Sequence, residues 1–189
     1  MPKMKPVKRL AAIAAFASLV WLGLCQMGNA EAEASFHHAP HANLQGYYIP
    51  INDVRIGNFK LNHISIGTND ELDTFEKTGK SGIENYAPVM IALDDTSSPT
   101  GTNELGQTYY EKTERILPTA YDIRAKRFTF SGTGKTLGPV KFVGHADPEK
   151  IRTARNSLSH TSEGAAMTGT LTVGKATISN VELMWFGGE

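Results

Sequence analysis

The fold of this chain is decided by the stretch Met167-Thr-Gly-Thr-Leu-Thr-Val-Gly-Lys-Ala-Thr-Ile-Ser-Asn-Val-Glu-Leu-Met-Trp-Phe186. Apolar and polar residues alternate on both sides of Gly174-Lys175, and such alternation is typical of half-buried β-strands. A two-residue Gly-x connection suits a type II′ turn, because glycine reaches positive φ without steric cost. The sequence therefore predicts a hairpin of strands 166–173 and 176–186.

The pairing register of this hairpin follows from its turn. Val173 should face Ala176, and Leu171 should face Ile178, so that one side of the ribbon is apolar. Beyond Ile178 the alternation shifts by one residue, so the later apolar residues would point to the opposite face of the strand. A β-bulge near Ser179-Asn180 would restore a single apolar face. The residues on the shifted face are Val181, Leu183 and Trp185.

The same pattern extends back to Tyr47, as short apolar segments separated by the turn-forming residues Gly, Pro, Asn and Asp. We expect six further strands, over residues 47–56, 59–66, 89–93, 108–117, 121–131 and 140–144. Such a run of short strands without a helix between each pair is typical of antiparallel sheet. The predicted fold class is mainly β, an antiparallel β-sandwich or small β-barrel, in a single domain over residues 47–189.

One or two short helices are expected beside the sheet. Asp147-Pro148-Glu149 supplies an N-cap, a proline in the first turn and an acidic residue, and apolar residues then recur on one face. These apolar residues are Ile151, Ala154 and Leu158. Residues 70–77 form the second, weaker candidate, with Gly79 placed to end it.

The first thirty residues have the pattern of a bacterial secretory signal peptide. A basic head precedes the fifteen apolar residues 10–24, and small residues end the segment at Ala30. The apolar run is shorter than the roughly 20 residues of a permanent membrane helix, so a cleaved leader is favoured over an anchor. We expect cleavage after Ala30, with Ala32 and Ala34 as alternatives, a periplasmic or secreted product, and no membrane span after cleavage.

Removal of residues 1–30 changes the chemistry that remains. Four basic residues leave and no acidic one does, so fifteen basic and nineteen acidic side chains give a formal charge of about −4. No cationic stripe follows residue 30, which argues against nucleic acid or anionic lipid as a partner. Cys25 is the only cysteine, so the mature chain has no disulfide and no thiolate chemistry.

Three histidines are concentrated near the predicted mature N-terminus. Residues 31–46 lack a sustained period, so we expect a flexible arm that carries His37, His38 and His41. Imidazole nitrogens suit Cu, Ni or Zn ions, and these three residues are the metal-site candidates. If the chain began at Ser35, its amine and the third-position imidazole of His37 would favour square-planar Cu(II) or Ni(II). The alternative is a solvated arm without a function for its histidines.

Adjacent aromatic residues indicate where a ligand surface could form. In a strand, neighbouring side chains point to opposite faces, so one ring of each pair is directed away from the core. The pairs are Tyr47/Tyr48, Tyr109/Tyr110 and Trp185/Phe186. From these we take Tyr48, Tyr110 and Trp185 as candidate ligand-binding residues, while burial in a second apolar layer is the alternative.

Two loops resemble known ligand motifs but lack their spacing. Ser131-Gly-Thr-Gly-Lys-Thr136 has Thr129 where a phosphate-binding loop needs its first glycine, and a strand rather than a helix follows it. Residues 93–104 are rich in oxygen ligands, yet they do not match a calcium-binding EF-hand loop. Both are interpreted as solvated connections between strands.

His145 is the candidate for a catalytic base. It directly follows the predicted strand 140–144 and lies two residues before Asp147, which would orient its ring unless that carboxylate caps the helix. No Gly-x-Ser-x-Gly or Ser-x-x-Lys motif places a nucleophile, so a hydrolase assembled around His145 is only an alternative hypothesis.

The hairpin Met167–Phe186 resembles the closing hairpin of the YceI-like periplasmic proteins, over about twenty residues. The resemblance implies a lipocalin-like barrel that holds a long isoprenoid lipid. The histidine-containing strand that opens that family has no counterpart around residues 47–66. Together, the sequence favours an exported, non-catalytic binding or accessory protein for a hydrophobic small molecule or a protein partner. The alternatives are the metal-binding protein and the hydrolase described above.

Overall fold

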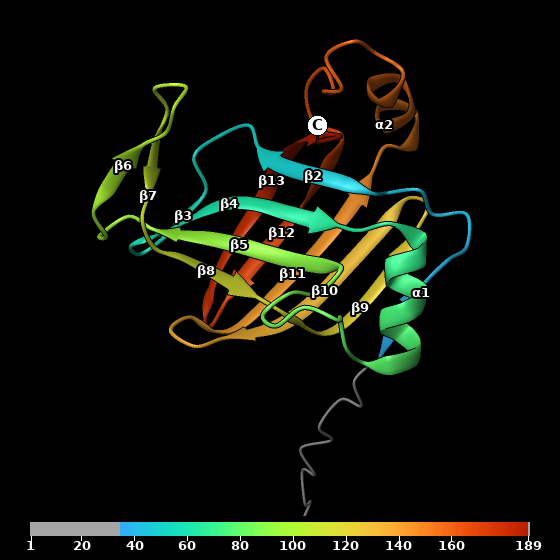
Figure 1. Cartoon of the computed structure of the whole chain (residues 1–189), viewed down its shortest axis with the longest axis horizontal. Coiled ribbons are helices and arrows are strands. Elements are labelled where there is room, and N and C mark those ends of the chain that lie inside the picture. Colours follow the sequence, from blue (N-terminus) through green and yellow to red (C-terminus); the bar gives the residue numbers. More distant parts are fainter. Residues whose placement is uncertain (1–34, 189) are drawn as a thin grey trace, which may run out of the picture. The chain divides into compact units, whose positions relative to one another are not determined.

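One long, strongly curled sheet dominates the structure (Figure 1), a computed structural model that describes residues 35–188. The predicted leader and its cleavage sites lie outside the described residues. The sheet order is β1-β9-β10-β11-β12-β13-β2-β4-β5-β8, with β3 beside β4, and all neighbours are antiparallel except β1 and β9. The strands are β1 Phe36–His38, β2 Gly46–Pro50, β3 Arg55–Ile56, β4 Phe59–Ile66, β5 Val89–Asp95, β8 Thr113–Ile116, β9 Pro118–Arg124, β10 Arg127–Gly134, β11 Gly138–Ala146, β12 Met167–Val173 and β13 Ala176–Phe186.

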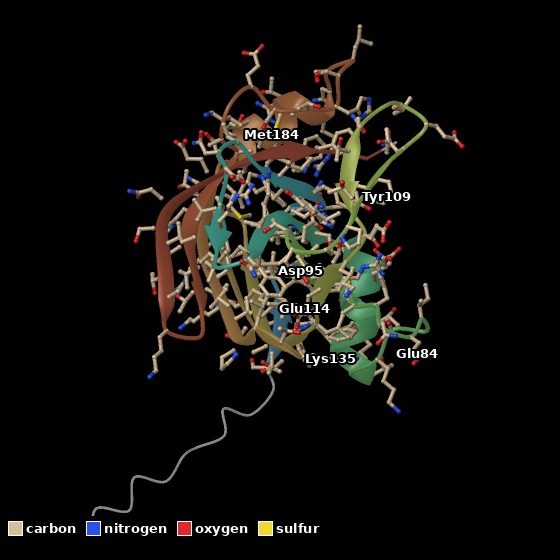
Figure 2. The ribbon with its side chains drawn as sticks, turned by 90° about the vertical axis from the view of Figure 1, so that its left-hand side faces the viewer. Glu84, Asp95, Tyr109, Glu114, Lys135 and Met184 are labelled. Carbon is tan, nitrogen blue, oxygen red and sulfur yellow. The ribbon has the colours of Figure 1, made fainter. Side chains whose placement is uncertain are left out.

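The curl brings the two ends of the sheet together. β8 leads through Leu117 directly into β9, so the chain passes from one end of the sheet to the other. The Glu114 carboxylate of β8 accepts a hydrogen bond of 3.0 Å from the backbone N–H of Thr136, in the turn after β10. Figure 2 shows Glu114 beside Lys135 of that same turn. The sheet is a half-barrel, which confirms the mainly β, barrel-like or sandwich-like fold class.

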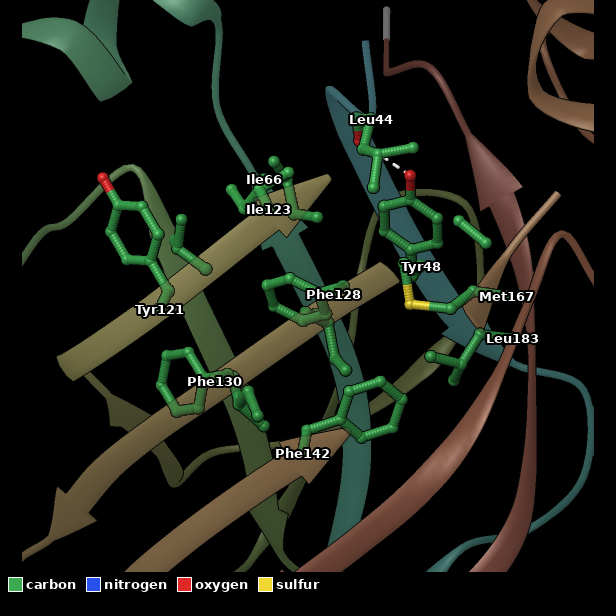
Figure 3. Close-up of a cluster of buried hydrophobic side chains, with 14 of the residues drawn as sticks. Leu44, Tyr48, Ile66, Tyr121, Ile123, Phe128, Phe130, Phe142, Met167 and Leu183 are labelled. Atoms are coloured by element: carbon green, nitrogen blue, oxygen red, sulfur yellow. Dashed lines mark hydrogen bonds between the residues drawn. The ribbon is translucent and has the colours of Figure 1, made fainter. Parts of the chain in front are cut away.

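Large apolar side chains fill the space inside the curl (Figure 3). β10 and β11 contribute aromatic rings from one side, and β2, β4 and β5 contribute apolar side chains from the other. The buried residues with the largest side chains include Trp185, Tyr48, Phe128, Phe130, Phe142, Ile64, Ile91 and Leu183. Because these residues pack against one another, the inside of the curl is a core of the kind found in small barrels.

The C-terminal hairpin has the register that the sequence predicts. Val173 pairs with Ala176 and Leu171 with Ile178, and φ of Gly174 is 57°, as a type II′ turn requires. The register then shifts, and Asn180, with φ of 56°, lies in the extra segment of β13. The predicted bulge is therefore confirmed, and it turns the later apolar residues of β13 toward the core.

Three of the long predicted strands are each two strands. Residues 47–56 divide between β2 and β3. Residues 121–131 divide between β9 and β10, and residues 108–117 divide between β8 and β7, Thr108–Tyr110, which pairs only with β6, Thr100–Thr102. The turn between β9 and β10 is Ala125-Lys126. It contains no Gly, Pro, Asn or Asp, so the sequence gives no turn signal there.

Both predicted helices are present; Asp147 and Gly79 cap them as predicted, whereas the capping box that begins the first helix was not predicted. α1, Asn69–Thr78, begins with a capping box between Thr68 and Glu71 and ends at Gly79, whose φ is 64°. α2, Pro148–Arg155, begins at Asp147, whose side chain accepts hydrogen bonds from two backbone N–H groups. α2 ends before Leu158, which is exposed. Neither described helix is long and apolar enough to cross a membrane.

The structure differs from the flexible arm predicted for residues 31–46, in the part that it describes. β1 lies parallel to β9, and Phe36 packs against Phe75 of α1, with ring centroids 5.0 Å apart. Ala42 and Leu44 are also buried. The segment is held by partners that are distant in sequence, and local periodicity carries no signal for such partners.

Candidate functional site

An open groove of about 890 Å³ crosses the outer face of the sheet over β2, β4 and β5. Its lining side chains alternate along each strand with core residues, so they point away from the inside of the curl. The N-terminal end of α1 and the segment before β5 form one wall.

A single cross-strand row forms the floor of the groove. The pairing register places Phe186 opposite Tyr47, Tyr47 opposite Ser65, and Ser65 opposite Met90. Neighbouring side chains in such a row lie close enough to form one continuous surface. The rings of Tyr47 and Phe186 have their centroids 6.3 Å apart. The floor therefore offers two aromatic rings and a thioether around one small hydroxyl.

Among the side-chain nitrogen and oxygen atoms of the described groove residues, the Ser65 hydroxyl is the one that is buried and lacks a hydrogen-bond partner. Leaving a buried hydroxyl without a partner costs about 1–3 kcal/mol. A ligand with a polar atom above Ser65 would remove that cost. Ser65 is thus a candidate polar contact in an otherwise aromatic floor.

One wall of the groove is fixed by hydrogen bonds around Glu71. Its Oε2 accepts bonds of 2.8 Å from the backbone N–H and 3.1 Å from the hydroxyl of Thr68, and its Oε1 accepts a 3.1 Å bond from Tyr86. Burial and then the negative Glu71 carboxylate raise the pKa of Tyr86 to about 12. The carboxylate is therefore occupied, and Tyr86 is a neutral donor at physiological pH.

His63 and Arg115 extend the groove toward β8. The bulge in β4 at Asn62 leaves both Asn62 and His63 outside the core, and the Nδ1 atom of His63 lies 2.7 Å from Oδ1 of Asn62. The His63 ring meets the edge of Tyr47 at a centroid distance of 5.4 Å. Arg115 is exposed, and no carboxylate of the described residues lies within ion-pair distance of it.

We expect His63 to titrate below the ordinary histidine pKa of about 6.5. Burial lowers the pKa of His63; Asp94 opposes this, and the Arg115 charge lowers it further. Because folding disfavours the protonated ring, the contribution of His63 to stability is present above about pH 6.5 and is lost as pH falls through the lowered pKa. An NMR titration of the His63 Cε1 proton measures this value. Arg115→Gln should raise it, and an unchanged value in that variant would contradict the assignment.

No hydrogen bond joins the His63 ring to the Ser65 hydroxyl in the described structure. A nucleophile needs such a contact with its general base, or one that can form with a small movement. The described structure therefore does not pair His63 with Ser65.

The structure corrects two of the predicted ligand-binding residues. Tyr48 and Trp185 are 0% and 2% exposed, so they belong to the core. The Tyr48 hydroxyl donates to the carbonyl of Leu44 at 2.7 Å, and Nε1 of Trp185 donates to the carbonyl of Gln45 at 2.9 Å. The outward rings of these two pairs are instead those of Tyr47 and Phe186. Strand alternation separates the two faces but does not say which face is covered.

Tyr110, the third candidate, lies on the small β6–β7 sheet. Its neighbour Tyr109, labelled in Figure 2, is 50% exposed on the same strand. Neither residue lines the groove.

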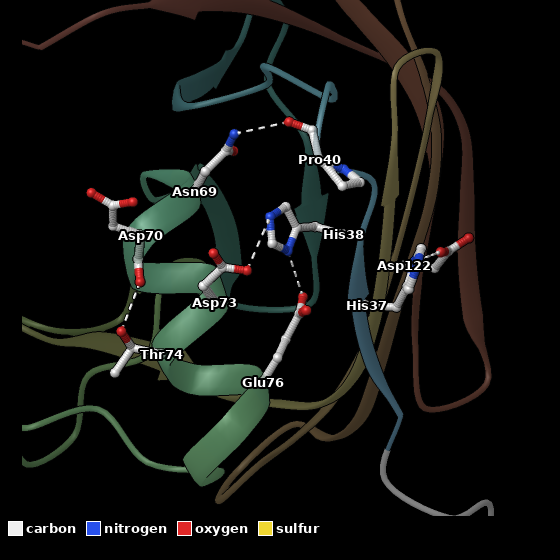
Figure 4. Close-up of polar contacts among 9 residues, drawn as sticks. All are labelled: His37, His38, Pro40, Asn69, Asp70, Asp73, Thr74, Glu76 and Asp122. Atoms are coloured by element: carbon white, nitrogen blue, oxygen red, sulfur yellow. Dashed lines mark hydrogen bonds and ion pairs between the residues drawn. The ribbon is translucent and has the colours of Figure 1, made fainter.

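The structure also separates the three histidines proposed as one metal site. His37 and His38 are adjacent in β1 and therefore point to opposite faces. His37 is directed outward and lies 2.8 Å from Asp122, whereas His38 is directed toward α1 (Figure 4). His41 is exposed beyond the strand. The cluster in the sequence is therefore not a cluster in space.

The structure gives Asp147 a helix-capping role and no hydrogen bond to His145 among the described residues. His145 is exposed on β11. The Asp147 carboxylate accepts the first free N–H groups of α2, as an N-cap does. The pattern Asp147-Pro148-Glu149 predicts this capping role, which the structure confirms.

No family model, no curated protein and no solved structure matches the chain. The resemblance of the closing hairpin to the YceI-like proteins therefore stands on those twenty residues alone.

Proposed function

We propose that this protein is an exported, non-catalytic binding protein whose outer groove holds a small amphipathic anion. The ligand would have a flat or chain-like apolar body and one anionic group. The observation that carries the proposal is the floor of the groove, a row of Phe186, Tyr47, Ser65 and Met90 that leads toward an unpaired arginine.

The apolar body is supported by the rings that line the groove. Tyr47 is 43% exposed although it lies within a sheet, so much of its ring is available to a ligand. Phe186 lies beside it, and Tyr86 faces the groove from the wall. Burying an aromatic surface against these rings would supply most of the binding free energy.

The anionic group is supported by the charges around the groove. Both oxygens of Glu71 already accept hydrogen bonds, so this carboxylate is not free to recruit a cation. Arg115 has no carboxylate partner in the described residues and lies opposite Ala92, which pairs with His63. A guanidinium binds carboxylate or sulfonate groups through paired hydrogen bonds. The free cation at this end favours an anion over a neutral lipid.

The test uses 1-anilinonaphthalene-8-sulfonate, a fluorescent probe with flat apolar rings and one sulfonate. We expect saturable binding to the native protein, weakened about tenfold in Phe186→Ala and about fivefold in Arg115→Gln, because an aromatic contact and a charge-assisted bond are each worth about 1–2 kcal/mol. Dodecanoate, a carboxylate with an apolar chain, should compete with the probe. Fluorescence titration at two salt concentrations measures both effects.

Two variants outside the groove serve as matched controls. Tyr109→Ala removes an exposed aromatic ring from β7, and Arg127→Gln removes an exposed arginine from β10. Both should bind the probe with the affinity of the unmodified protein. Equal loss in control and groove variants, or no saturable binding to the native protein, would overturn the proposal. Competition by a protein fraction but not by dodecanoate would point to a protein partner instead and would also reject the small-molecule ligand.

A further inference from the structure

His38, the last residue of β1, is buried against α1, where its ring faces two carboxylates of that helix (Figure 4). Its side chain is 5% exposed; Nδ1 lies 2.9 Å from Oε1 of Glu76, and Nε2 lies 3.8 Å from Oδ1 of Asp73. Asp73 and Glu76 are three residues apart, so the helix places both on the face that meets β1. One histidine and two acids from distant segments therefore converge on one point.

The distance between His38 and Asp73 is informative. At 3.8 Å, Nε2 and Oδ1 are too far apart for a hydrogen bond. Two bonds of about 2.0–2.2 Å, the lengths of Zn–N and Zn–O bonds, would span this distance with an ion between the atoms. One ligand atom from each of His38, Asp73 and Glu76 lies within 4.8 Å of the other two.

A second observation concerns the buried hydroxyl of Tyr121. The residue is 2% exposed. Burial raises the pKa of Tyr121, and the charge of Glu76 and a hydrogen bond to that carboxylate raise it further, so the hydroxyl lies next to Glu76. Figure 3 shows it directed away from the apolar cluster.

Glu76 faces two buried groups at once. Its carboxylate lies 2.9 Å from Nδ1 of His38 and beside the Tyr121 hydroxyl. A carboxylate on one ring nitrogen fixes the orientation of a metal-binding histidine. This leaves Nε2, on the side of Asp73, as the nitrogen that would bind an ion.

We propose that His38, Asp73 and Glu76 bind a divalent transition-metal ion of the zinc class, which joins β1 to α1. A nitrogen and carboxylate oxygens suit Zn²⁺ and Co²⁺, and the mature chain offers no thiolate as a stronger alternative. This site differs from the predicted set of three histidines, because it uses His38 without His37 or His41. It lies on a different part of the sheet from the groove and does not depend on the function proposed there.

Zinc affinity of the purified protein tests the site, measured by competition with a chromophoric chelator. We expect His38→Gln and Asp73→Asn each to weaken Zn²⁺ binding by about tenfold or more, since each removes a ligand. The double variant with His37→Gln and His41→Gln should bind as the unmodified protein does. With Co²⁺, the unmodified protein and the double variant should show a visible absorption band that is absent from His38→Gln.

Asp73→Asn keeps the experiment decisive if His38→Gln fails to fold. The Asp73 side chain is 55% exposed on the helix surface, so its replacement by an isosteric amide should leave the circular dichroism spectrum unchanged. Undiminished Zn²⁺ affinity in Asp73→Asn would overturn the proposal. So would loss of binding in the double variant with His38 intact, which would favour a solvated histidine segment. Absence of measurable Zn²⁺ binding by the unmodified protein would also reject the site.

Discussion

Replacing Trp185 by alanine is expected to lower the free energy of unfolding by about 3–5 kcal/mol, the range for removal of a large buried aromatic side chain. Trp185 is 2% exposed in the core. Its Nε1 donates a 2.9 Å hydrogen bond to the carbonyl of Gln45, and the guanidinium of Arg155 lies 5.4 Å from its ring. The substitution would remove the indole from the core and leave the Gln45 carbonyl without its hydrogen-bond donor. It would also remove the contact between the indole ring and the Arg155 guanidinium. Equilibrium denaturation in urea measures the change.

Phe186→Ala is the matched control for this prediction. Phe186 is the next residue in β13 and points into the outer groove, where it is only half-buried. Its removal should cost less than half as much stability as the loss of Trp185, yet it should weaken probe binding. The two neighbours would then separate core packing from ligand binding. A larger stability loss in Phe186→Ala than in Trp185→Ala would contradict the assignment of faces.

Gly46→Ala is expected to destabilise the protein by about 2–6 kcal/mol. The φ angle of Gly46 is 138°, a conformation that costs other residues about 1–3 kcal/mol. A Cβ atom there would lie 2.2 Å from Nε1 and 2.8 Å from Cε2 of Trp185, so the indole would have to move. Such overpacking adds about 1–3 kcal/mol. Thermal and urea denaturation measure the loss.

Gly57→Ala separates backbone strain from the clash at Gly46. Gly57 has φ of 57°, but nothing lies within 4 Å of a Cβ atom built there. Its substitution should cost about 1–2 kcal/mol, the strain of a left-handed alanine. The excess in Gly46→Ala then combines the less accessible φ of 138° with the clash against Trp185, and the clash part should shrink when Trp185 is replaced by Phe. An excess that Trp185→Phe leaves unchanged would mean that the indole moves freely.

Gly46 and Trp185 lie where the core meets the groove. Gly46 precedes Tyr47 in β2, and Gly46 itself lines the groove together with Gln45. The indole of Trp185 holds the Gln45 carbonyl from the core side. The position of the Tyr47 ring is therefore fixed by packing on the opposite face of the same strand.

The sequence by itself determined the features that depend on neighbouring residues. The turn at Gly174, the bulge at Asn180 and the N-caps at Thr68 and Asp147 are each formed within a few residues. Asp147 was recognised as a cap from its sequence; the capping box at Thr68 has the same kind of local signature. The alternation of the strands was enough for the mainly β fold class, because a strand with one apolar face must bury that face.

The tertiary structure alone decided which face is buried and which distant segments meet. Tyr47 and Tyr48 cannot be assigned to outside and inside by their alternation, and in the structure Tyr48 is in the core while Tyr47 lines the groove. The meeting of His38 with Asp73 and Glu76 depends on the pairing of β1 with β9 and on the packing of α1. Such contacts form only when the whole sheet curls, because the free energy that selects them comes from burying the shared core and not from any local sequence preference.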